Sequence, residues 1–245
     1  MDALRPDGRL PHQARPVRIQ VGVLDHPEGS ALIEAGRTRV LCTVTVEERI
    51  PAFLRGAGRG WVTAEYGMLP RSTRERIPRE QGRERGRMME IQRLIGRSLR
   101  AVTDLSALGE RTFLVDCDVL QADGGTRTAS ITGAYVALYH ACWNLLRQGL
   151  LERMPLRCAV AGISAGVVDG VPMVDLCYEE DVRAEVDLNL ALTETGDLVE
   201  VQGTGETGPF SRQTLLTLLD LAWQGVQPLF EAQRSALAGL EAPAG

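Results

Sequence analysis

A glycine turn followed by Thr126, Arg127 and Thr128 is the segment best suited to bind an anion. It follows residues 113–120, a mainly apolar predicted strand, and precedes a long uncharged stretch. Glycines let the backbone turn with exposed N–H groups, a helix N-terminus adds unpaired donors and partial positive charge, and an arginine grips two phosphate oxygens. We therefore predict a tetrahedral-anion site at Gly125, Thr126 and Arg127, where a strand passes into a helix. An ordinary glycine turn with a surface arginine is the alternative.

Arginines are concentrated in residues 71–87, which we predict to form a flexible loop. This window has a net charge of +4 in a chain whose net charge is −5, and the chain contains no lysine. An arginine-rich loop attracts the phosphodiester backbone of a nucleic acid, whereas a solvated run of charges is the alternative. The arginines are residues 71, 74, 76, 79, 83, 85 and 87, and the glutamates are residues 75, 80 and 84.

Carboxylates are dense in residues 175–187. If residues 185–192 form a strand, Glu185 and Asp187 lie on the same face. Neighbouring carboxylates repel one another unless a cation lies between them, and Mg²⁺ is commonly bound by one or two carboxylates together with substrate phosphates. The cluster therefore indicates a metal site, with a solvated acidic turn as the alternative.

The composition is that of a globular protein with free thiols. A chain of 245 residues with 44% hydrophobic content can bury a sizeable core, and we predict a single domain over residues 1–245. The five cysteines include no Cys-x-x-Cys pair, so reduced thiols and a cytoplasmic location are expected, without zinc. The N-terminus has no apolar signal segment, and the uncharged residues 128–146 are expected to form a buried helix and no membrane span.

Two other motifs are excluded as sites. Residues 203–208 match the dinucleotide pattern G-x-G-x-x-G, but only one helix follows, without the next parallel strand that such a site needs. Residues 162–166 match the Gly-x-Ser-x-Gly pattern of serine hydrolases, but they lie inside the predicted strand 158–168 and not at the strand-to-helix elbow that such an enzyme needs.

The elements that must position these residues follow from periodicity and turn chemistry. Strands are clustered apart from helices, which predicts an α+β fold with helices packed on a mixed sheet. Asp169-Gly170 and residues 195–197 are hairpin turns, and Ser211 is the expected N-cap of the last helix. The predicted strands are 17–23, 30–35, 38–46, 111–120, 158–168, 171–177, 184–192 and 198–202, the predicted helices are 86–103, 127–149 and 210–240, and residues 47–86 are assigned mostly to loop.

An anion site, a basic loop and an acidic cluster together indicate phosphoryl transfer on a polyanion. The sequence as a whole resembles the bacterial ribonuclease PH family of phosphorolytic 3′→5′ exoribonucleases. The resemblance extends over nearly the whole chain, through residues 34–46, 60–71, 90–97, 116–133, 181–187 and 200–204. It departs at residues 79–86, at Met88 and Met89 and at Gly205, where the family usually has other residues.

The resemblance implies a two-layer α+β ribonuclease PH fold, related to ribosomal protein S5 domain 2, and a homohexameric ring built as a trimer of dimers. It implies trimming of precursor tRNA, with rRNA as a further substrate, by inorganic phosphate, which reversibly releases nucleoside 5′-diphosphates. A non-catalytic RNA-binding subunit is the alternative. The residues carried over are Arg87, Gly125, Thr126 and Arg127 for phosphate, Asp181 and Asp187 for catalysis and for Mg²⁺ (or Mn²⁺), and Arg71, Arg76 and Arg79 for tRNA.

Overall fold

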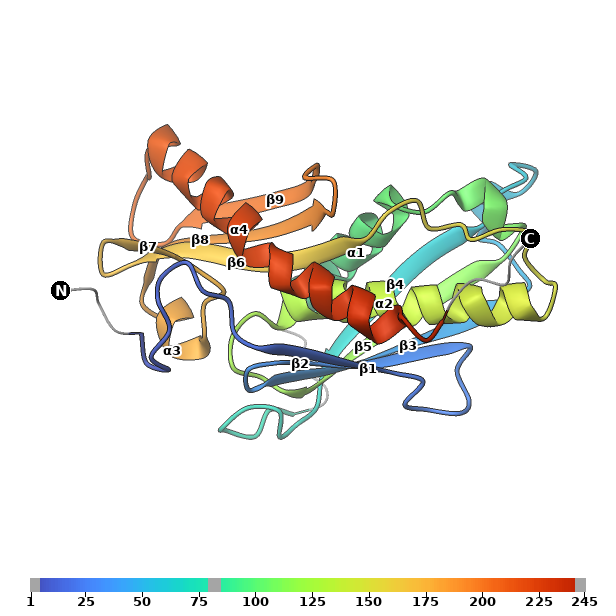
Figure 1. Ribbon diagram of the computed structural model, residues 1–245, viewed down its shortest axis with the longest axis horizontal. Helices are drawn as coiled ribbons and strands as arrows, with labels where there is room; N and C mark the ends of the chain where they lie inside the picture. The colour runs from blue at the N-terminus through green and yellow to red at the C-terminus, as the bar shows by residue number, and fades with distance from the viewer. Residues whose placement is uncertain (1–4, 79–84, 241–245) are drawn as a thin grey trace.

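The first half of the chain forms a five-stranded mixed sheet in the order β1-β2-β3-β5-β4 (Figure 1). The computed structural model describes residues 5–78 and 85–240. The strands are β1 (Val17–Val21), β2 (Gly29–Ala35), β3 (Thr38–Glu47), β4 (Trp61–Met68) and β5 (Thr112–Gln121). All neighbours are antiparallel except β4 and β5, which are parallel. Along β3 and β5 alternate residues are buried, as expected for strands with one face on a core.

The second sheet is antiparallel and has four strands in the order β7-β6-β8-β9. Its strands are β6 (Val160–Val168), β7 (Val171–Val174), β8 (Ala184–Thr193) and β9 (Leu198–Gly205). The Asp169-Gly170 turn has φ values of 51° and 75°, as a two-residue hairpin of this type requires. Strands β8 and β9, on either side of residues 195–197, are also antiparallel neighbours. Both predicted hairpins are therefore confirmed.

Three long helices, α1 (Arg85–Ala101), α2 (Thr126–Arg147) and α4 (Arg212–Leu237), each contact both sheets. Helix α2 is buried along most of its length because small residues let it approach the strands: a Cβ at Gly133 would lie 2.7 Å from Ile33. The expectation of a buried helix at residues 128–146 is confirmed, and within the described ranges no helix is long and apolar enough to cross a membrane. The predicted Ser211 N-cap accepts a hydrogen bond from Thr214 N at 3.0 Å.

One hydrophobic core runs between the two sheets. It contains Phe113 and Ile33 of the first sheet, Ile163 and Leu188 of the second, and Phe230 of α4, all at most 1% exposed. Burying each such side chain contributes about 1.5–3 kcal/mol. The core thus fixes the two sheets against the helices, while the assignment of residues 1–245 to a single domain stays a prediction.

The predicted α+β class is confirmed, but some elements of the structure were not predicted from the sequence. Strand β4 lies in the segment expected to be loop, because its buried residues Val62, Ala64 and Tyr66 are flanked by glycines that obscure the alternation. Strand β7 ends at Val174, earlier than expected, because Asp175 has a φ of 50°. Also unforeseen are the short helix α3 (Tyr178–Asp181) and two 3₁₀ helices, Ala52–Leu54 and Leu105–Leu108.

Candidate active site

The predicted anion turn lies where β5 leads into α2. Gly124 and Gly125 have φ values of 74° and 65°, a backbone conformation that favours glycine. Gly125 is the N-cap of α2, and no side chain caps the helix there. The N–H groups of the first turn of this 22-residue helix are therefore available to an anion, on which the helix dipole also acts. The Thr126 hydroxyl lies 2.8 Å from the Tyr66 hydroxyl at the end of β4.

Arg87 and Arg127 are brought to this turn from different helices. Arg87 lies in the first turn of α1 and Arg127 in the first turn of α2, and both cations act electrostatically on the buried Tyr66 and on Asp181. Burial raises the pKa of Tyr66, although the hydrogen bond with Thr126 and the two arginines oppose this. Two arginines and a helix N-terminus thus concentrate positive potential in one place.

Asp181 and Asp187 approach these arginines from the second half of the chain: Arg87 and Arg127 both act on Asp181, and Arg127 acts on Asp187. Asp181 ends α3 and Asp187 lies in β8. Partial desolvation raises the pKa of Asp181, and Arg127 and Arg87 oppose that shift. Desolvation raises the pKa of Asp187, the charge of Asp181 raises it further, and Arg127 and a hydrogen bond from Asn189 oppose these effects.

The structure therefore brings together the five side chains predicted for phosphate binding and for catalysis. They are Arg87, Thr126, Arg127, Asp181 and Asp187. They come from α1, α2, α3 and β8, segments far apart in the sequence.

Three further residues belong to this site and were not foreseen. Tyr66 contacts Thr126, and Asn189 Nδ2 donates to Asp187 Oδ2 at 2.9 Å. The carboxylate of Glu206, which follows β9, raises the pKa of both aspartates. Asn189 has a sequence signal, since it lies two residues from Asp187 on the same strand face. Tyr66 had none, because its strand was not predicted.

The remaining carboxylates of residues 175–187 have structural partners. Glu180 is 1% exposed and forms a two-bond ion pair with Arg5, with both N···O distances at 2.6 Å. Asp175 is paired with Arg15, and Glu185 accepts from Gly170 N. The acidic cluster is thus divided, and Asp181 and Asp187 are left to face the arginines.

The aspartate pair suits a metal ion that is shared with a substrate. Carboxylate oxygens are the ligands that Mg²⁺ and Mn²⁺ prefer, and Mg²⁺ commonly completes its shell with water and phosphate oxygens. Among the residues that the structure describes, no group of three or more His, Cys, Asp or Glu side chains could hold a metal without such help. Asp181 and Asp187 could therefore hold such an ion if water or phosphate oxygens complete its shell.

Residues 71–78, the described part of the arginine-rich segment, lie beside the residues that lead into the anion turn. Ser72 O accepts a hydrogen bond from Ala122 N at 2.8 Å, so the loop lies next to the residues that lead into the turn. Arg71 and Arg76 are exposed there, and Arg74 lies 3.4 Å from Glu179 of α3. Arg79 lies outside the described residues. The loop is placed where it could contact a polyanion entering the site.

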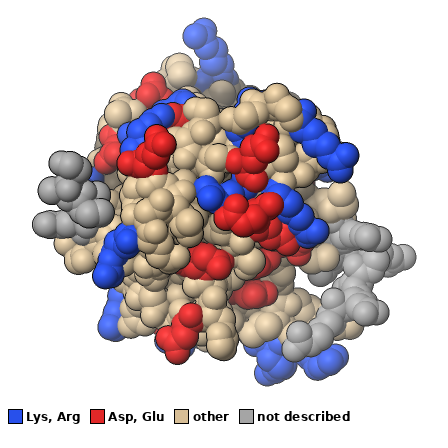
Figure 2. All heavy atoms as spheres, turned by 90° about the vertical axis from the view of Figure 1, so that its right-hand side faces the viewer, with Lys and Arg blue, Asp and Glu red and all other residues tan. Residues whose placement is uncertain are grey.

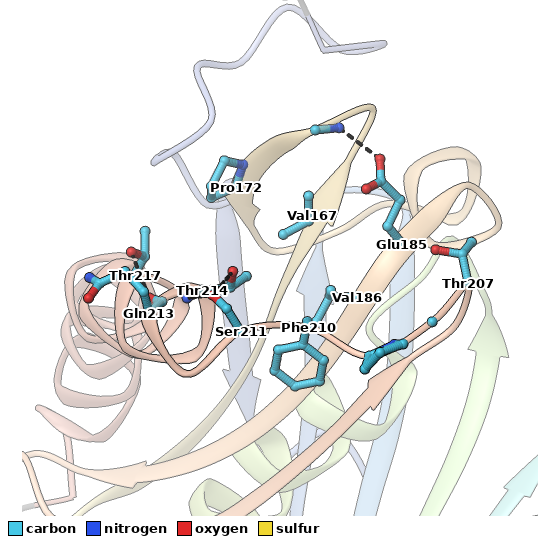
Figure 3. Close-up of a pocket in the computed structure, with 13 residues that line it drawn as sticks. Val167, Pro172, Glu185, Val186, Thr207, Phe210, Ser211, Gln213, Thr214 and Thr217 are labelled. Atoms are coloured by element: carbon cyan, nitrogen blue, oxygen red, sulfur yellow. Dashed lines mark hydrogen bonds between the residues drawn. The ribbon is translucent and has the colours of Figure 1, made fainter.

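Two other surfaces lack these features. A cavity of about 560 Å³ lies between the β6–β7 hairpin, the start of β8 and the N-terminus of α4 (Figure 3). Glu185 is the charged residue in its lining, and none of the predicted site residues contributes to it. Figure 2 shows the end of the molecule that is on the right in Figure 1, where acidic and basic side chains lie side by side. Arg111 pairs with Glu48, and Arg153 pairs with Asp104.

Comparisons with known proteins agree with this fold. Family models of the 3′ exoribonuclease (RNase PH) family match residues 13–143 with domain 1 and residues 158–225 with domain 2. The chain therefore belongs to the RNase PH 3′ exoribonuclease family.

Three solved structures have the same fold. Rice (Oryza sativa) Rrp46 is 20% identical with a TM-score of 0.77, over 95% of this chain and 100% of that chain. The Archaeoglobus fulgidus exosome with RNA bound to the active site is 25% identical with a TM-score of 0.79, over 94% and 92%. An archaeal exosome core is 23% identical with a TM-score of 0.77, over 96% and 92%.

Proposed function

We propose that this chain is a phosphorolytic 3′→5′ exoribonuclease of the bacterial ribonuclease PH type. The observation that carries the proposal is that a positively charged group of residues lies across from a pair of carboxylates. Arg87, Arg127 and the uncapped N-terminus of α2 form an anion site, and Asp181 and Asp187 face it. A non-catalytic RNA-binding subunit would not need to keep both groups.

In the proposed reaction inorganic phosphate is the nucleophile. Arg87, Arg127, the Thr126 hydroxyl and the backbone N–H groups at Gly125 and Thr126 hold it beside the last phosphodiester of an RNA 3′ end. Bringing two anions into line requires cancelling their repulsion, and the arginines do this in a preorganised site. Mg²⁺ or Mn²⁺ bound to Asp181 and Asp187 would supply further positive charge.

The bond changes balance as a phosphoryl transfer. An oxygen of phosphate forms a bond to the phosphorus, and the bond from phosphorus to the O3′ of the preceding nucleotide breaks. The terminal nucleotide leaves as a nucleoside 5′-diphosphate, and O3′ receives a proton. Desolvation raises the pKa of both Asp181 and Asp187, so one carboxyl of the pair is suited to give that proton while the other stays ionised. Because the bond types are alike on both sides, the reaction should also run in reverse.

We further propose precursor tRNA, and rRNA as a second candidate, as the substrate. The exposed Arg71 and Arg76, with Arg79 in the same segment, would read the backbone charge of a folded RNA. We expect a homohexamer, a trimer of dimers. The five cysteines are free, which fits a reducing cytoplasm.

The phosphate requirement tests the activity. Labelled RNA should release nucleoside diphosphates only when inorganic phosphate is added. Arg127→Met should lower turnover by about a hundredfold or more, because an arginine that stabilises transition-state charge is lost. Arg147→Met is the matched control, since it lies at the other end of the same helix, about 30 Å away. Release of nucleoside monophosphates without phosphate would instead make the protein a hydrolase.

The loop arginines test the tRNA assignment. Arg71→Gln with Arg76→Gln should raise KM for precursor tRNA and flatten its dependence on salt, since each lost phosphate contact lowers the salt slope by roughly one. Arg18→Gln with Arg157→Gln changes the net charge equally at exposed positions elsewhere and should have little effect. If a short oligonucleotide suffers as much as tRNA, the loop does not act on the tRNA body.

A further inference from the structure

A buried arginine–aspartate pair lies directly against the anion turn. Arg15 is 4% exposed and Asp175 is 8% exposed. Arg15 Nη2 donates to Asp175 Oδ1 at 2.7 Å, and Nε and the backbone N of Arg15 donate to Oδ2 at 2.9 and 2.7 Å. Burial alone would raise the pKa of Asp175, but the bonds from Arg15 hold it below its usual value. The pair is therefore charged at neutral pH.

The remaining donors of Arg15 hold the carbonyl groups of the turn. Nη1 donates to Asp123 O at 2.6 Å, and Nη2 lies 3.4 Å from Gly124 O. On the same side the Thr38 hydroxyl donates to Gly124 O at 2.7 Å and accepts from Asp123 N at 2.9 Å. In a planar trans peptide the C=O of one residue and the N–H of the next point in opposite directions. Holding the carbonyls of residues 123 and 124 therefore turns the N–H groups of Gly124 and Gly125 away from Arg15 and Thr38.

The same pair joins the turn to the segment that carries Asp181. The backbone of residues 176–178 contacts Gly124 so closely that a Cβ there would lie 2.5 Å from Leu176 O. Asp175 O accepts from Arg5 Nη2 at 2.9 Å, and Arg5 also holds Glu180, which precedes Asp181. The anion turn and the carboxylate segment are thus attached to one buried ionic framework, residues 5, 15, 175 and 180.

We propose that Arg15, held by Asp175, is a positioning residue that orients the backbone N–H groups of the anion turn for inorganic phosphate. Arg15 does not touch the phosphate in this arrangement, because its donors are used by Asp175 and the turn carbonyls. The inference rests on the proposed role of phosphate as co-substrate. It assigns a functional part to the N-terminal segment, which no motif in the sequence marked.

The test removes the pair without leaving a buried charge unpaired. Removing only Arg15 would leave Asp175 uncompensated, which is strongly destabilising, so the variant is Arg15→Met with Asp175→Asn. Arg18→Met is the matched control, an exposed arginine in the same segment. The affinity for inorganic phosphate is measured by calorimetric titration without RNA, and KM values for phosphate and for a short RNA are measured separately.

We expect the folded double variant to bind phosphate about tenfold to a hundredfold more weakly, because small misplacements of positioning groups have effects of this size. KM for RNA should change less than about twofold, and Arg18→Met should behave as the wild type. An unchanged phosphate affinity in a folded variant would overturn the inference. An equal loss of phosphate and RNA affinity in the folded variant would also overturn it, because the effect would then not be specific to the phosphate site.

A second variant decides the matter if the first does not fold. Thr38→Val keeps the shape of a fully buried side chain and removes its two hydrogen bonds to the turn. It should weaken phosphate binding while RNA affinity is kept, and unchanged phosphate binding would count against the inference. If the wild type binds phosphate and releases no nucleoside diphosphate, the proposed activity fails while the titrations still test Arg15. If the wild type binds no phosphate, both fail.

Discussion

Replacing Gly124 with alanine tests whether the anion turn is the centre of the activity. Gly124 has a φ of 74°, and a Cβ there would lie 2.5 Å from Leu176 O, 2.7 Å from Cys177 C and 2.8 Å from Tyr178 N. All three neighbours are backbone atoms, which cannot rotate aside. An ordinary contact needs about 3.5 Å, so the turn and the 176–178 backbone must separate by about 1 Å.

Such a displacement moves both halves of the site. The turn carries Gly125, Thr126 and Arg127, and the 176–178 backbone leads to Asp181. A misplacement of about 1 Å can lower a rate by about a hundredfold. The left-handed φ adds about 1–2 kcal/mol of destabilisation, and the overpacking adds about 1–3 kcal/mol. We therefore expect a folded, less stable protein with about a hundredfold lower turnover.

The assay is phosphate-dependent release of nucleoside diphosphate from a short RNA, together with urea unfolding. Gly149→Ala is the matched control, because Gly149 has a φ of 70° but no atom within 4 Å of the added Cβ. It should show the left-handed cost in stability and full activity. If Gly124→Ala keeps activity within about threefold of the wild type, the turn does not position the reacting groups and the reasoning is wrong.

Two further predictions concern the carboxylates. Asn189→Ala removes a hydrogen bond that lowers the pKa of Asp187, so the pKa of Asp187 should rise. The acid limb of the pH profile of kcat/KM, where the ionised carboxylate is lost, should therefore move to higher pH. An acid limb that stays in place would show that Asp187 does not control it. Arg5→Met should lower the free energy of unfolding at pH 7 by about 3–5 kcal/mol, because it leaves Glu180 buried without its partner, and Arg5→Met with Glu180→Gln should cost less. Desolvation raises the pKa of Glu180, but Arg5 holds it below its usual value, so this stabilisation exists above the unfolded pKa and is lost as pH falls through the folded pKa. The difference between wild type and Arg5→Met in urea should therefore shrink in acid.

Local features of the sequence determined much of this protein. The position of the anion turn followed from glycines 124 and 125 and from the strand before them. Both a left-handed glycine turn and the alternation of a strand depend only on residues that are close together in the sequence. The hairpin at Asp169-Gly170 and the Ser211 cap followed from the same local chemistry, and the long helices were correct to within a few residues. Asp181 and Asp187 were selected by resemblance, not by spacing.

Only the tertiary structure decided which charges act together. The sequence shows Asp175, Glu180, Asp181 and Asp187 as one acidic run, yet Arg5 and Arg15, more than 150 positions away, neutralise two of them. Tyr66 reaches Thr126 because β4 pairs in parallel with β5, a register that depends on the closed core and not on the local pattern. Local preference fixes where a chain turns, whereas long-range packing decides which buried charges are paired and which remain free for chemistry.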